Sequence, residues 1–350
     1  MRIFITHVAP REVGRKAGVS VAATNFSYNL IDGCVFDKCY SVLPPFVKGI
    51  AKTALSDSRI DIKYSSFRNS PIGKVAPILE QWEIFKKIPN GASVWLYNIT
   101  PLNAYLIKLL RNFKPKVRIF AIVLDYTPGD PKAEKFLPLI NECDGRILLS
   151  TSKLFDNKNT KCLPGVVPLN EDVSPMIAEL NPEFLISGQF SEQISLLSRL
   201  LPVFSKLSNA TLHISGAITD MARQYAAKYP NIILHENLTF EQYLNLLHSV
   251  TFQLSTRNPN MPENECNFPS KIIEALLHNR IVVSTINYPQ LGAIKYIKVD
   301  ADNLEEDIAS IINNISAYKE YANQSILTKE MFNTAKWLDA MEQIEKNISE

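Results

Sequence analysis

The sequence predicts an α/β protein built from two Rossmann-like domains. Segments typical of strands and of helices alternate along all 350 residues, which favours βαβ units around parallel sheets. This alternation pauses once, between residues 162 and 182, and then restarts. A chain of this length also exceeds what one hydrophobic core usually serves. We therefore expect a first domain over residues 1–167 and a second over residues 168–350, facing each other across a central cleft.

The first half contains the strongest strand signals. Residues 117–124 read Val-Arg-Ile-Phe-Ala-Ile-Val-Leu, an apolar run typical of a strand buried in a parallel sheet. Pro101 suits the first turn of a helix, because its missing N–H would be unpaired there anyway. The expected strands are 2–8, 93–99, 117–124 and 145–150, and the expected helices are 19–31, 101–113 and about 132–142.

The second half repeats the pattern after a segment rich in turn formers, residues 162–168, where we place the domain boundary. In the last helix one face carries Trp337, Leu338, Met341 and Ile344, so we expect this helix to pack back onto the first domain. The expected strands are 183–187, 210–214, 231–235, 250–255 and 281–285, and the expected helices are 192–206, 219–228, 239–248 and one that begins near Pro269.

Composition indicates a soluble globular protein. Apolar residues make up 46% of the chain and charged residues 21%, and no apolar run approaches the roughly 18 residues of a membrane span. The five cysteines are scattered and form no C-x-x-C motif, so neither a disulfide scaffold nor a zinc cluster is expected. A reducing cytoplasm fits this cysteine usage.

The net charge of +2 hides a strong asymmetry between the halves. Residues 1–167 contain 24 Lys/Arg and 13 Asp/Glu, whereas residues 168–350 contain 13 and 22. A basic first half is either a solvated surface or a means of contacting an anionic membrane or a polyanionic acceptor. Cytoplasmic location at the inner face of the cell membrane would follow from membrane contact. Nucleic acid is not an expected partner, because no zinc-finger spacing, RNP-like motif or Arg-rich arm is present.

The most informative motif is the segment 267–276, Asn-Phe-Pro-Ser-Lys-Ile-Ile-Glu-Ala-Leu. Pro269 favours a helix start, which would leave the N–H groups of Ser270 and Lys271 facing a ligand at the positive end of the helix dipole. Glu274 would lie on the same face, one turn further along. This pattern predicts an anion site, although ordinary helix capping and a solvated Lys–Glu pair would also produce it.

The second half resembles the nucleotide-sugar-binding domain of GT-B-fold glycosyltransferases, most nearly the large retaining family that contains bacterial polysaccharide transferases. The resemblance covers roughly 160 residues, with the matching segments in the family's order. They are Leu-Ile-Ser-Gly at 185–188, Leu-His-Ile-Ser-Gly at 212–216, the segment 232–239, Gln-Leu-Ser-Thr at 253–256, Asn-Phe-Pro-Ser-Lys at 267–271 with Glu274, and Ile-Val-Val-Ser-Thr at 281–285.

The resemblance implies how a nucleoside diphosphate sugar would be held. Ser270 and Lys271 would contact the diphosphate, and Glu274 would accept hydrogen bonds from ribose hydroxyls. Gly188 and Gly216 would let the backbone approach the nucleotide, although each could equally be a simple turn glycine between a strand and a helix.

Two further features of the family map less fully onto this chain. The loop containing Asn237 and Leu238 would lie at the edge of the base, or would simply connect a strand to a helix. Where many members carry a Glu that touches the transferred sugar, this chain has Cys266, with Glu265 nearby as a candidate catalytic residue. These departures leave open the contact with the sugar and the choice between retention and inversion.

The cations that many family members carry soon after the first strand of this domain are also missing, because Gln189 and Glu192 occupy that region. A diphosphate still requires positive charge, and Arg257 is the candidate replacement, together with Lys271. No Asp-x-Asp signature indicates a metal-bound diphosphate, so we expect no metal and no cofactor.

The acceptor is expected to bind the first domain. Asp125 follows the strand at 117–124 and would be a general base in an inverting reaction, although it also fits a simple turn. Gly14, Lys16 and Gly18 lie in the segment after the first strand, which we expect to be a loop facing the cleft. His7 is expected at the end of that strand rather than as a base.

We therefore expect a glycosyltransferase that moves a sugar from a nucleoside diphosphate to a glycan or a lipid-linked glycan, as in the biosynthesis of bacterial surface polysaccharides such as O-antigen or capsule. A nucleotide-sugar epimerase on the same fold is one alternative. A regulatory or scaffold protein that has kept the fold and lost catalysis is another, and Cys266 is its best support.

Overall fold

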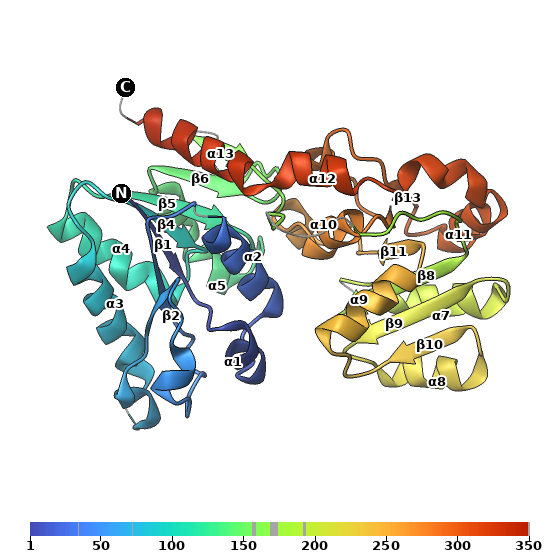
Figure 1. The fold of residues 1–350 in the computed structure, drawn as a ribbon, viewed down its shortest axis with the longest axis horizontal. Coiled ribbons are helices and arrows are strands. Elements are labelled where there is room, and N and C mark those ends of the chain that lie inside the picture. The colour runs from blue at the N-terminus through green and yellow to red at the C-terminus, as the bar shows by residue number, and fades with distance from the viewer. Residues whose placement is uncertain (34, 72, 156–158, 169–173, 192–193, 349–350) are drawn as a thin grey trace. The chain divides into compact units, whose positions relative to one another are not determined.

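The computed structural model describes residues 1–33, 35–71, 73–155, 159–168, 174–191 and 194–348 (Figure 1). The chain forms two compact units. The first comprises Met1–Asn170, Glu265–Phe268 and Phe332–Glu350, and the second comprises Glu171–Asn264 and Pro269–Met331. Each unit contains one parallel sheet with helices on its faces, which confirms the α/β class with two Rossmann-like halves.

The first unit is built on a seven-stranded sheet in the order β3-β2-β1-β4-β5-β6-β7, and all neighbouring strands are parallel. The strand order reverses between β1 and β4, and such a reversal opens a crevice at the carboxyl ends of the strands. The strands are β1 (Arg2–Thr6), β2 (Lys38–Val42), β3 (Asp61–Lys63), β4 (Ser93–Tyr97), β5 (Arg118–Val123), β6 (Gly145–Leu148) and β7 (Thr160–Cys162).

Alternate side chains of these strands enter two separate cores. Ile3 and Ile5 pack into the cluster that includes residues of α3 and α4. On the other face Phe4 stacks on Phe36, with ring centroids 4.5 Å apart. The helices of this unit are α1 (Arg11–Lys16), α2 (Val21–Asp32), α3 (Ala76–Lys87), α4 (Pro101–Phe113), α5 (Pro131–Glu134), α6 (Leu137–Asn141) and α13 (Thr334–Lys346).

Several elements of the first unit are not predicted by local sequence patterns. The short strands β2, β3 and β7 and the helix α3 fall in this group. The segment between β2 and α3 is tied down by the buried ion pair of Arg68 and Glu80, whose atoms approach to 2.5 Å. Arg68 also donates to the carbonyl oxygens of Leu43 at 2.6 Å and Pro44 at 2.8 Å. Long-range contacts therefore order a segment whose own sequence pattern is weak.

One predicted helix is wrong in detail. The expected helix at about 132–142 is two short helices, α5 and α6. Pro138 lies at the start of α6, and its ring cannot donate the backbone hydrogen bond that a continuous helix would need there. The chain therefore starts a new helix instead of extending the first.

The second unit is built on a six-stranded parallel sheet in the order β10-β9-β8-β11-β12-β13. Its strand order reverses between β8 and β11. The strands are β8 (Glu183–Gly188), β9 (Thr211–Gly216), β10 (Ile232–His235), β11 (Phe252–Ser255), β12 (Ile281–Ser284) and β13 (Ile297–Lys298). The helices are α7 (Leu197–Lys206), α8 (Asp220–Lys228), α9 (Phe240–Ser249), α10 (Ser270–Leu277), α11 (Leu304–Asn313) and α12 (Ser325–Phe332).

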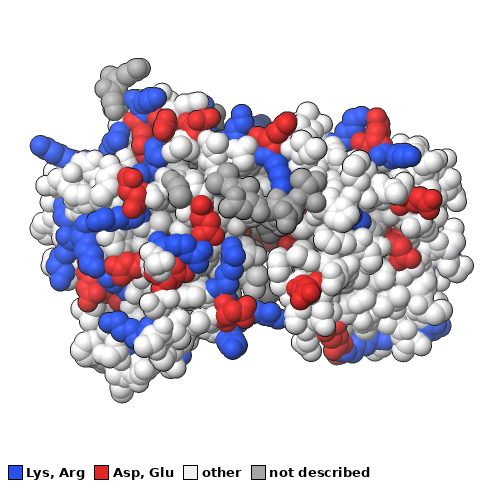
Figure 2. Space-filling view, in the orientation of Figure 1, with Lys and Arg blue, Asp and Glu red and all other residues white. Residues whose placement is uncertain are grey.

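The charge asymmetry of the sequence is visible on the surface. On the face shown in Figure 2, lysine and arginine side chains are more frequent over the first unit than over the second. In the part of the chain that the structure describes, no helix is both long enough and apolar enough to cross a bilayer.

The last helix, α13, belongs to the first unit, as the sequence predicts. Trp337, Met341 and Ile344 are fully or almost fully buried. The Trp337 ring meets the edge of Phe26 at a centroid distance of 5.3 Å, and its Nε1 donates to the carbonyl oxygen of Gly165 at 2.8 Å. The chain end therefore completes the core of the first unit.

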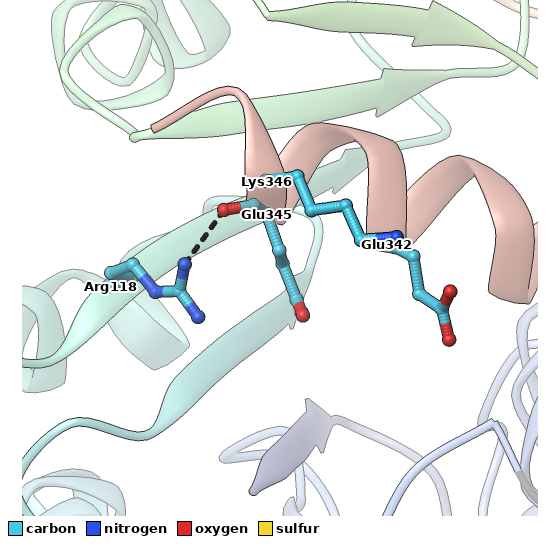
Figure 3. A pocket seen from close by; sticks show the side chains of 4 residues that line it. All are labelled: Arg118, Glu342, Glu345 and Lys346. Atoms are coloured by element: carbon cyan, nitrogen blue, oxygen red, sulfur yellow. Dashed lines mark hydrogen bonds between the residues drawn. The ribbon is translucent and has the colours of Figure 1, made fainter. Parts of the chain in front are cut away.

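A polar contact fixes the other end of α13. Glu345 accepts hydrogen bonds from Arg2 Nε at 2.9 Å and from Trp95 Nε1 at 2.8 Å. Arg118 donates to the main-chain carbonyl of Glu345 at 2.8 Å, as Figure 3 shows. Burial disfavours the ionised carboxylate, but the hydrogen bonds from Arg2 and Trp95 outweigh burial, so the pKa of Glu345 is lowered.

Beside this contact lies a pocket of about 200 Å³ lined by Arg118, Glu342, Glu345 and Lys346. Arg118 begins β5, so the pocket lies at the amino ends of the strands. Sheets of this kind bind ligands at the opposite, carboxyl ends. We therefore assign this pocket to the attachment of α13 and not to ligand binding.

We predict that Glu345→Ala lowers the free energy of unfolding of the first unit by about 2–4 kcal/mol at pH 7, because it leaves Arg2 unpaired and largely buried. Glu342→Ala is the matched control, since Glu342 is exposed on the same helix and should change stability little. Denaturant unfolding measures both.

A depressed pKa stabilises the fold above the unfolded-state pKa of about 4.3. The difference from wild type should therefore shrink as the pH falls below about 4, and equal stability of the two variants at pH 7 would contradict this assignment.

Candidate functional site

A pocket of about 160 Å³ lies within the second unit, where its sheet reverses between β8 and β11. Its lining comes from the carboxyl ends of these two strands and the residues just beyond them, from Ile194 and Ser195 before α7, and from the start of α10. The polar and charged lining residues are Ser187, Gln189, Ser195, Ser255, Thr256, Arg257 and Lys271. Every charged group among them is a cation, so the pocket is suited to an anion.

The start of α10 contributes backbone donors. Pro269 stands immediately before the helix with φ −69°, and no side chain caps the first turn. Ile272 N–H bonds to the Pro269 carbonyl oxygen at 3.0 Å. Among the described residues, the N–H groups of Ser270 and Lys271 are left for another acceptor at the positive end of the helix dipole. The helix start predicted at Pro269 is therefore present, and its first N–H groups are placed where an anion could accept from them.

Lys271 supplies one of the two cations of the pocket. Burial lowers the pKa of its ammonium group to about 8, partly offset by Glu274, while the charge of Arg257 lowers it further. The ammonium group is still mostly protonated at pH 7, and an anion that approaches it favours the charged form further. Its side chain extends over Gly188 at the end of β8.

Gly188 and Gly216 leave room that no other residue would leave. Gly188 has φ +116°, and a Cβ there would lie 2.2 Å from the Lys271 Nζ. Gly216 has φ +127°, and a Cβ there would lie 2.2 Å from the Gly188 carbonyl oxygen. Gly216 is therefore required by the close approach of backbone, whereas a Cβ at Gly188 would displace the flexible end of Lys271.

Arg257 follows β11 and supplies the second cation. In the described part of the chain, its Nη1 is buried and has no hydrogen-bond partner. Leaving a buried guanidinium nitrogen unpaired costs free energy. An anion bound between Arg257 and Lys271 would satisfy this nitrogen and also relieve the repulsion between the two cations.

Glu274 lies one turn into α10, as predicted, and is held by a residue that the sequence analysis missed. The Tyr243 hydroxyl donates to Glu274 Oε2 at 2.8 Å and approaches Ser187 Oγ at 3.5 Å. Burial raises the pKa of Tyr243 well above its ordinary value, and the Glu274 charge adds to this effect. Tyr243 therefore stays protonated and orients the carboxylate.

The loop at Asn237 and Leu238 connects β10 to α9. Asn237 is exposed in a left-handed conformation with φ 53°. Leu238 is half-buried against the cluster of Leu185 and Leu247. The loop is thus held in place by the core, and the described lining of the pocket does not include either residue.

The candidate residues of the first unit lie along the carboxyl edge of its sheet. Asp125 is exposed just beyond β5. The segment with Gly14 and Lys16 is not a loop but the helix α1, and Gly18, with φ +75°, ends it. The expectation of a loop here was wrong. The N–H of Gly14 donates to the Pro10 carbonyl oxygen at 2.8 Å, which is the hydrogen bond of a helix.

Buried His7 stands near this edge at the end of β1, as expected. Its Nδ1 lies 3.0 Å from the Val42 carbonyl oxygen. Burial lowers the pKa of His7 to about 4, opposed by this hydrogen bond, so the imidazole is neutral at pH 7.

The residues just before the α10 motif belong to the first unit. Cys266 is buried in the core of that unit, and burial raises the pKa of its thiol to about 11. The Glu265 carboxylate accepts from Ser152 Oγ at 3.3 Å and from Lys153 N–H at 3.2 Å. Both residues therefore have structural contacts in that unit. Glu192, named above as a departure from the family pattern, lies outside the described residues.

No group of three or more His, Cys, Asp or Glu side chains among the described residues could hold a metal ion.

Comparison with known proteins gives a fold. No protein-family model and no curated protein matches the sequence. Solved structures do match over the whole length. Anabaena HepE in complex with UDP-glucose aligns over 100% of this chain and 99% of its own, with 14% identity and a TM-score of 0.65. The lipopolysaccharide outer core galactosyltransferase WaaB aligns over 99% of both chains, with 14% identity and a TM-score of 0.65.

A third match is AviGT4, a glycosyltransferase of avilamycin A biosynthesis, with 13% identity and a TM-score of 0.61 over 100% of this chain and 98% of its own. At these identities the likeness concerns the fold. The chain has the two-domain GT-B fold of these glycosyltransferases, as the sequence predicts.

Proposed function

We propose that the protein is a glycosyltransferase that uses a nucleoside diphosphate sugar as donor. The observation that carries this proposal is the pairing of Arg257 and Lys271, two cations without a bound counter-charge, with the uncapped start of α10. Three different kinds of anion-binding group thus converge at the reversal of the second sheet. Solved structures with this fold include HepE in complex with UDP-glucose and with UDP, which supports the proposal.

In the proposed complex the diphosphate contacts Arg257, Lys271 and the N–H groups of Ser270 and Lys271. Glu274, oriented by Tyr243, accepts hydrogen bonds from the ribose hydroxyls, and the base lies toward Asn237 and Leu238. The cations and helix N–H groups stabilise the departing diphosphate electrostatically, so the proposed reaction needs no metal. A pocket of about 160 Å³ is smaller than a whole-ligand site of roughly 300 Å³ or more, which suits the diphosphate portion of the donor.

The acceptor side is a further part of the proposal. The acceptor is a glycan or a lipid-linked glycan, as in cell-surface polysaccharide synthesis, and the reaction takes place at the cytoplasmic face of an anionic membrane. We favour retention of anomeric configuration. Asp125 is the base that an inverting reaction would use, because it is exposed at the carboxyl end of β5. Glu265 is the weaker catalytic candidate, as the carboxylate nearest to the position of the missing sugar-contacting Glu, since Ser152 and Lys153 already engage it.

The direct test measures the binding of UDP, GDP and ADP and of their sugar derivatives by calorimetry. We expect one nucleoside diphosphate to bind, and Lys271→Ala or Arg257→Ala to weaken it roughly 10- to 100-fold, the worth of a charge-assisted hydrogen bond. Lys319→Ala is the matched control, because Lys319 is an exposed lysine of the same unit. Its affinity should equal that of wild type.

The same preparations then receive a donor sugar and a panel of acceptors, with and without EDTA. Transfer in EDTA, with the product's anomeric configuration read by NMR, supports the proposal in full. Epimerisation of the donor without any acceptor would favour the epimerase alternative. A protein that binds none of the nucleoside diphosphates is not a nucleotide-sugar enzyme.

The lowered pKa of Lys271 predicts a pH dependence of donor binding. A bound diphosphate favours the charged ammonium, so it raises the pKa of Lys271 from about 8 and binding takes up a proton above that pH. The affinity should stay level between pH 7 and pH 8 and then fall by up to about tenfold per pH unit until the bound-state pKa is reached. Lys271→Arg keeps its charge throughout and should remove this dependence. A wild-type affinity that does not change from pH 7.5 to pH 9.5 would refute the role of Lys271.

Gly188→Ala should weaken nucleoside diphosphate binding about tenfold or more with little loss of overall fold. The new Cβ would collide with the Lys271 ammonium, which is the movable end of a side chain and would be displaced from the pocket. The positive φ adds a strain of about 1–3 kcal/mol. Gly91→Ala is the control for strain alone, because Gly91 also has positive φ and nothing lies within 4 Å of its added Cβ. Equal binding by Gly188→Ala and wild type would show that Lys271 does not need this position.

A further inference from the structure

The helix α3 exposes an apolar stripe on the first unit. Val75, Ile78, Leu79 and Trp82 are 45%, 44%, 46% and 41% exposed. Their spacing places them on one side of the helix. The opposite side, which includes Pro77 and Ile84, is buried, so the stripe is a second apolar face of the same helix. A surface helix normally presents polar side chains there, and a contiguous exposed patch marks an interaction site.

An aromatic contact extends the stripe to α4. Trp82 stacks on Phe85 at a centroid distance of 5.2 Å, and Phe85 meets the edge of Phe113 at 6.3 Å. Phe113, at the end of α4, is 67% exposed. The apolar surface therefore spans both helices.

Lysines surround this surface. Lys74 precedes the stripe, Lys86 follows it, and Lys108 lies on α4; all three are exposed. No carboxylate of the described residues forms an ion pair with any of these three lysines. The segment 74–116 contains seven Lys/Arg and two Asp/Glu, a net charge of +5. Of the two carboxylates, Glu80 is buried against Arg68 and only Glu83 is exposed. Figure 2 shows basic side chains gathered over this end of the first unit, with acidic ones among them.

We infer that the α3–α4 surface, defined by the apolar stripe, Phe113 and the three lysines, docks onto an anionic lipid bilayer. Exposed Trp and aliphatic side chains can enter the headgroup region, while lysines beside them contact anionic headgroups. A polyanion such as nucleic acid or an acidic glycan would account for the lysines but not for the stripe. A second copy of the chain paired by two-fold symmetry would bring these same lysines against each other. The inference rests on the membrane location in the proposed function and names the surface that makes the contact, yet vesicle binding requires neither donor nor acceptor.

The test mixes the full-length protein with vesicles of phosphatidylcholine alone or with added phosphatidylglycerol. We expect sedimentation with the anionic vesicles, weaker binding to the neutral ones and a loss of binding as salt is raised. Tryptophan fluorescence reports the contact directly, because Trp82 is exposed whereas Trp95 and Trp337 are fully buried. A blue shift on vesicle binding would thus come from Trp82.

Two pairs of variants separate the apolar and the charged contributions. Leu79→Ser with Trp82→Ser, and Lys86→Glu with Lys108→Glu, should each weaken binding to anionic vesicles about tenfold or more. Ile326→Ser is the control for the first pair, since Ile326 is 63% exposed on α12. Lys228→Glu with Lys319→Glu is the control for the second, since both lysines are exposed in the other unit.

Unchanged vesicle binding by both variant pairs would overturn the inference, as would equal binding of wild type to neutral and anionic vesicles. Self-association that disappears in the Leu79→Ser, Trp82→Ser variant, without any vesicle binding by wild type, would identify an interface between copies and also overturn it. Nucleoside diphosphate affinity is measured on the same samples. Its retention shows that the variants are folded, and it keeps failure of membrane docking distinct from failure of the proposed function.

Discussion

The burial of two cations, Arg257 and Lys271, in one pocket at the start of α10 is the constraint on which the proposed site depends. Two cations share a small pocket in which one has a buried, unpaired nitrogen and the other a pKa lowered to about 8. Water and carboxylates would normally neutralise such a pair, and keeping both charges poorly compensated destabilises the ligand-free protein. The surrounding residues preserve the arrangement. Gly188 gives Lys271 its space, and Tyr243 holds Glu274 one turn away along α10.

The charge of the proposed site is opposite in sign to the net charge of the half of the sequence that contains it. The half of the sequence with the excess of carboxylates contains the proposed anion site, because a few cations at the sheet reversal decide what binds there. In the basic half, the carboxyl edge of the sheet carries neutral His7 and exposed Asp125, while Lys86, Lys87 and Lys108 lie on α3 and α4. Net charge alone would therefore place a diphosphate site in the first unit, whereas the proposed site lies in the second. This contrast supports a division in which the second unit takes the donor and the first unit takes the acceptor.

The sequence predicts much of the fold because parallel strands buried on both faces need continuous apolar runs, such as 117–124 and 281–285. The stripe containing Trp337 and Met341 likewise identifies a helix that needs a core to cover it. Strands β2, β3 and β7 are not predicted because they are short. Their conformation depends on contacts distant in sequence, such as the ion pair of Arg68 with Glu80 for the segment that contains β3. The break between α5 and α6, just before Pro138, is likewise not visible in the helical pattern of the sequence.

At the site, Ser270, Lys271 and Glu274 are predictable because they share one helical turn pattern. The contact between Lys271 and Gly188 joins residues far apart in the chain, so only the folded structure shows it. In the sequence, Tyr243 has the pattern of an ordinary core residue of α9. Only the structure shows that its hydroxyl donates a hydrogen bond to Glu274. For Cys266, the sequence suggests a proximity to the site that the structure does not support. It is adjacent to the motif in sequence, but the chain enters the first unit for residues 265–268, and the thiol is buried there.

The central claim is tested most directly by a crystal structure with a bound nucleoside diphosphate. We predict phosphate oxygens within hydrogen-bond distance of Arg257 Nη1, Lys271 Nζ and the N–H groups at the start of α10, with a ribose hydroxyl on Glu274. A diphosphate bound elsewhere, with Arg257 and Lys271 still lacking an anion, would contradict the account.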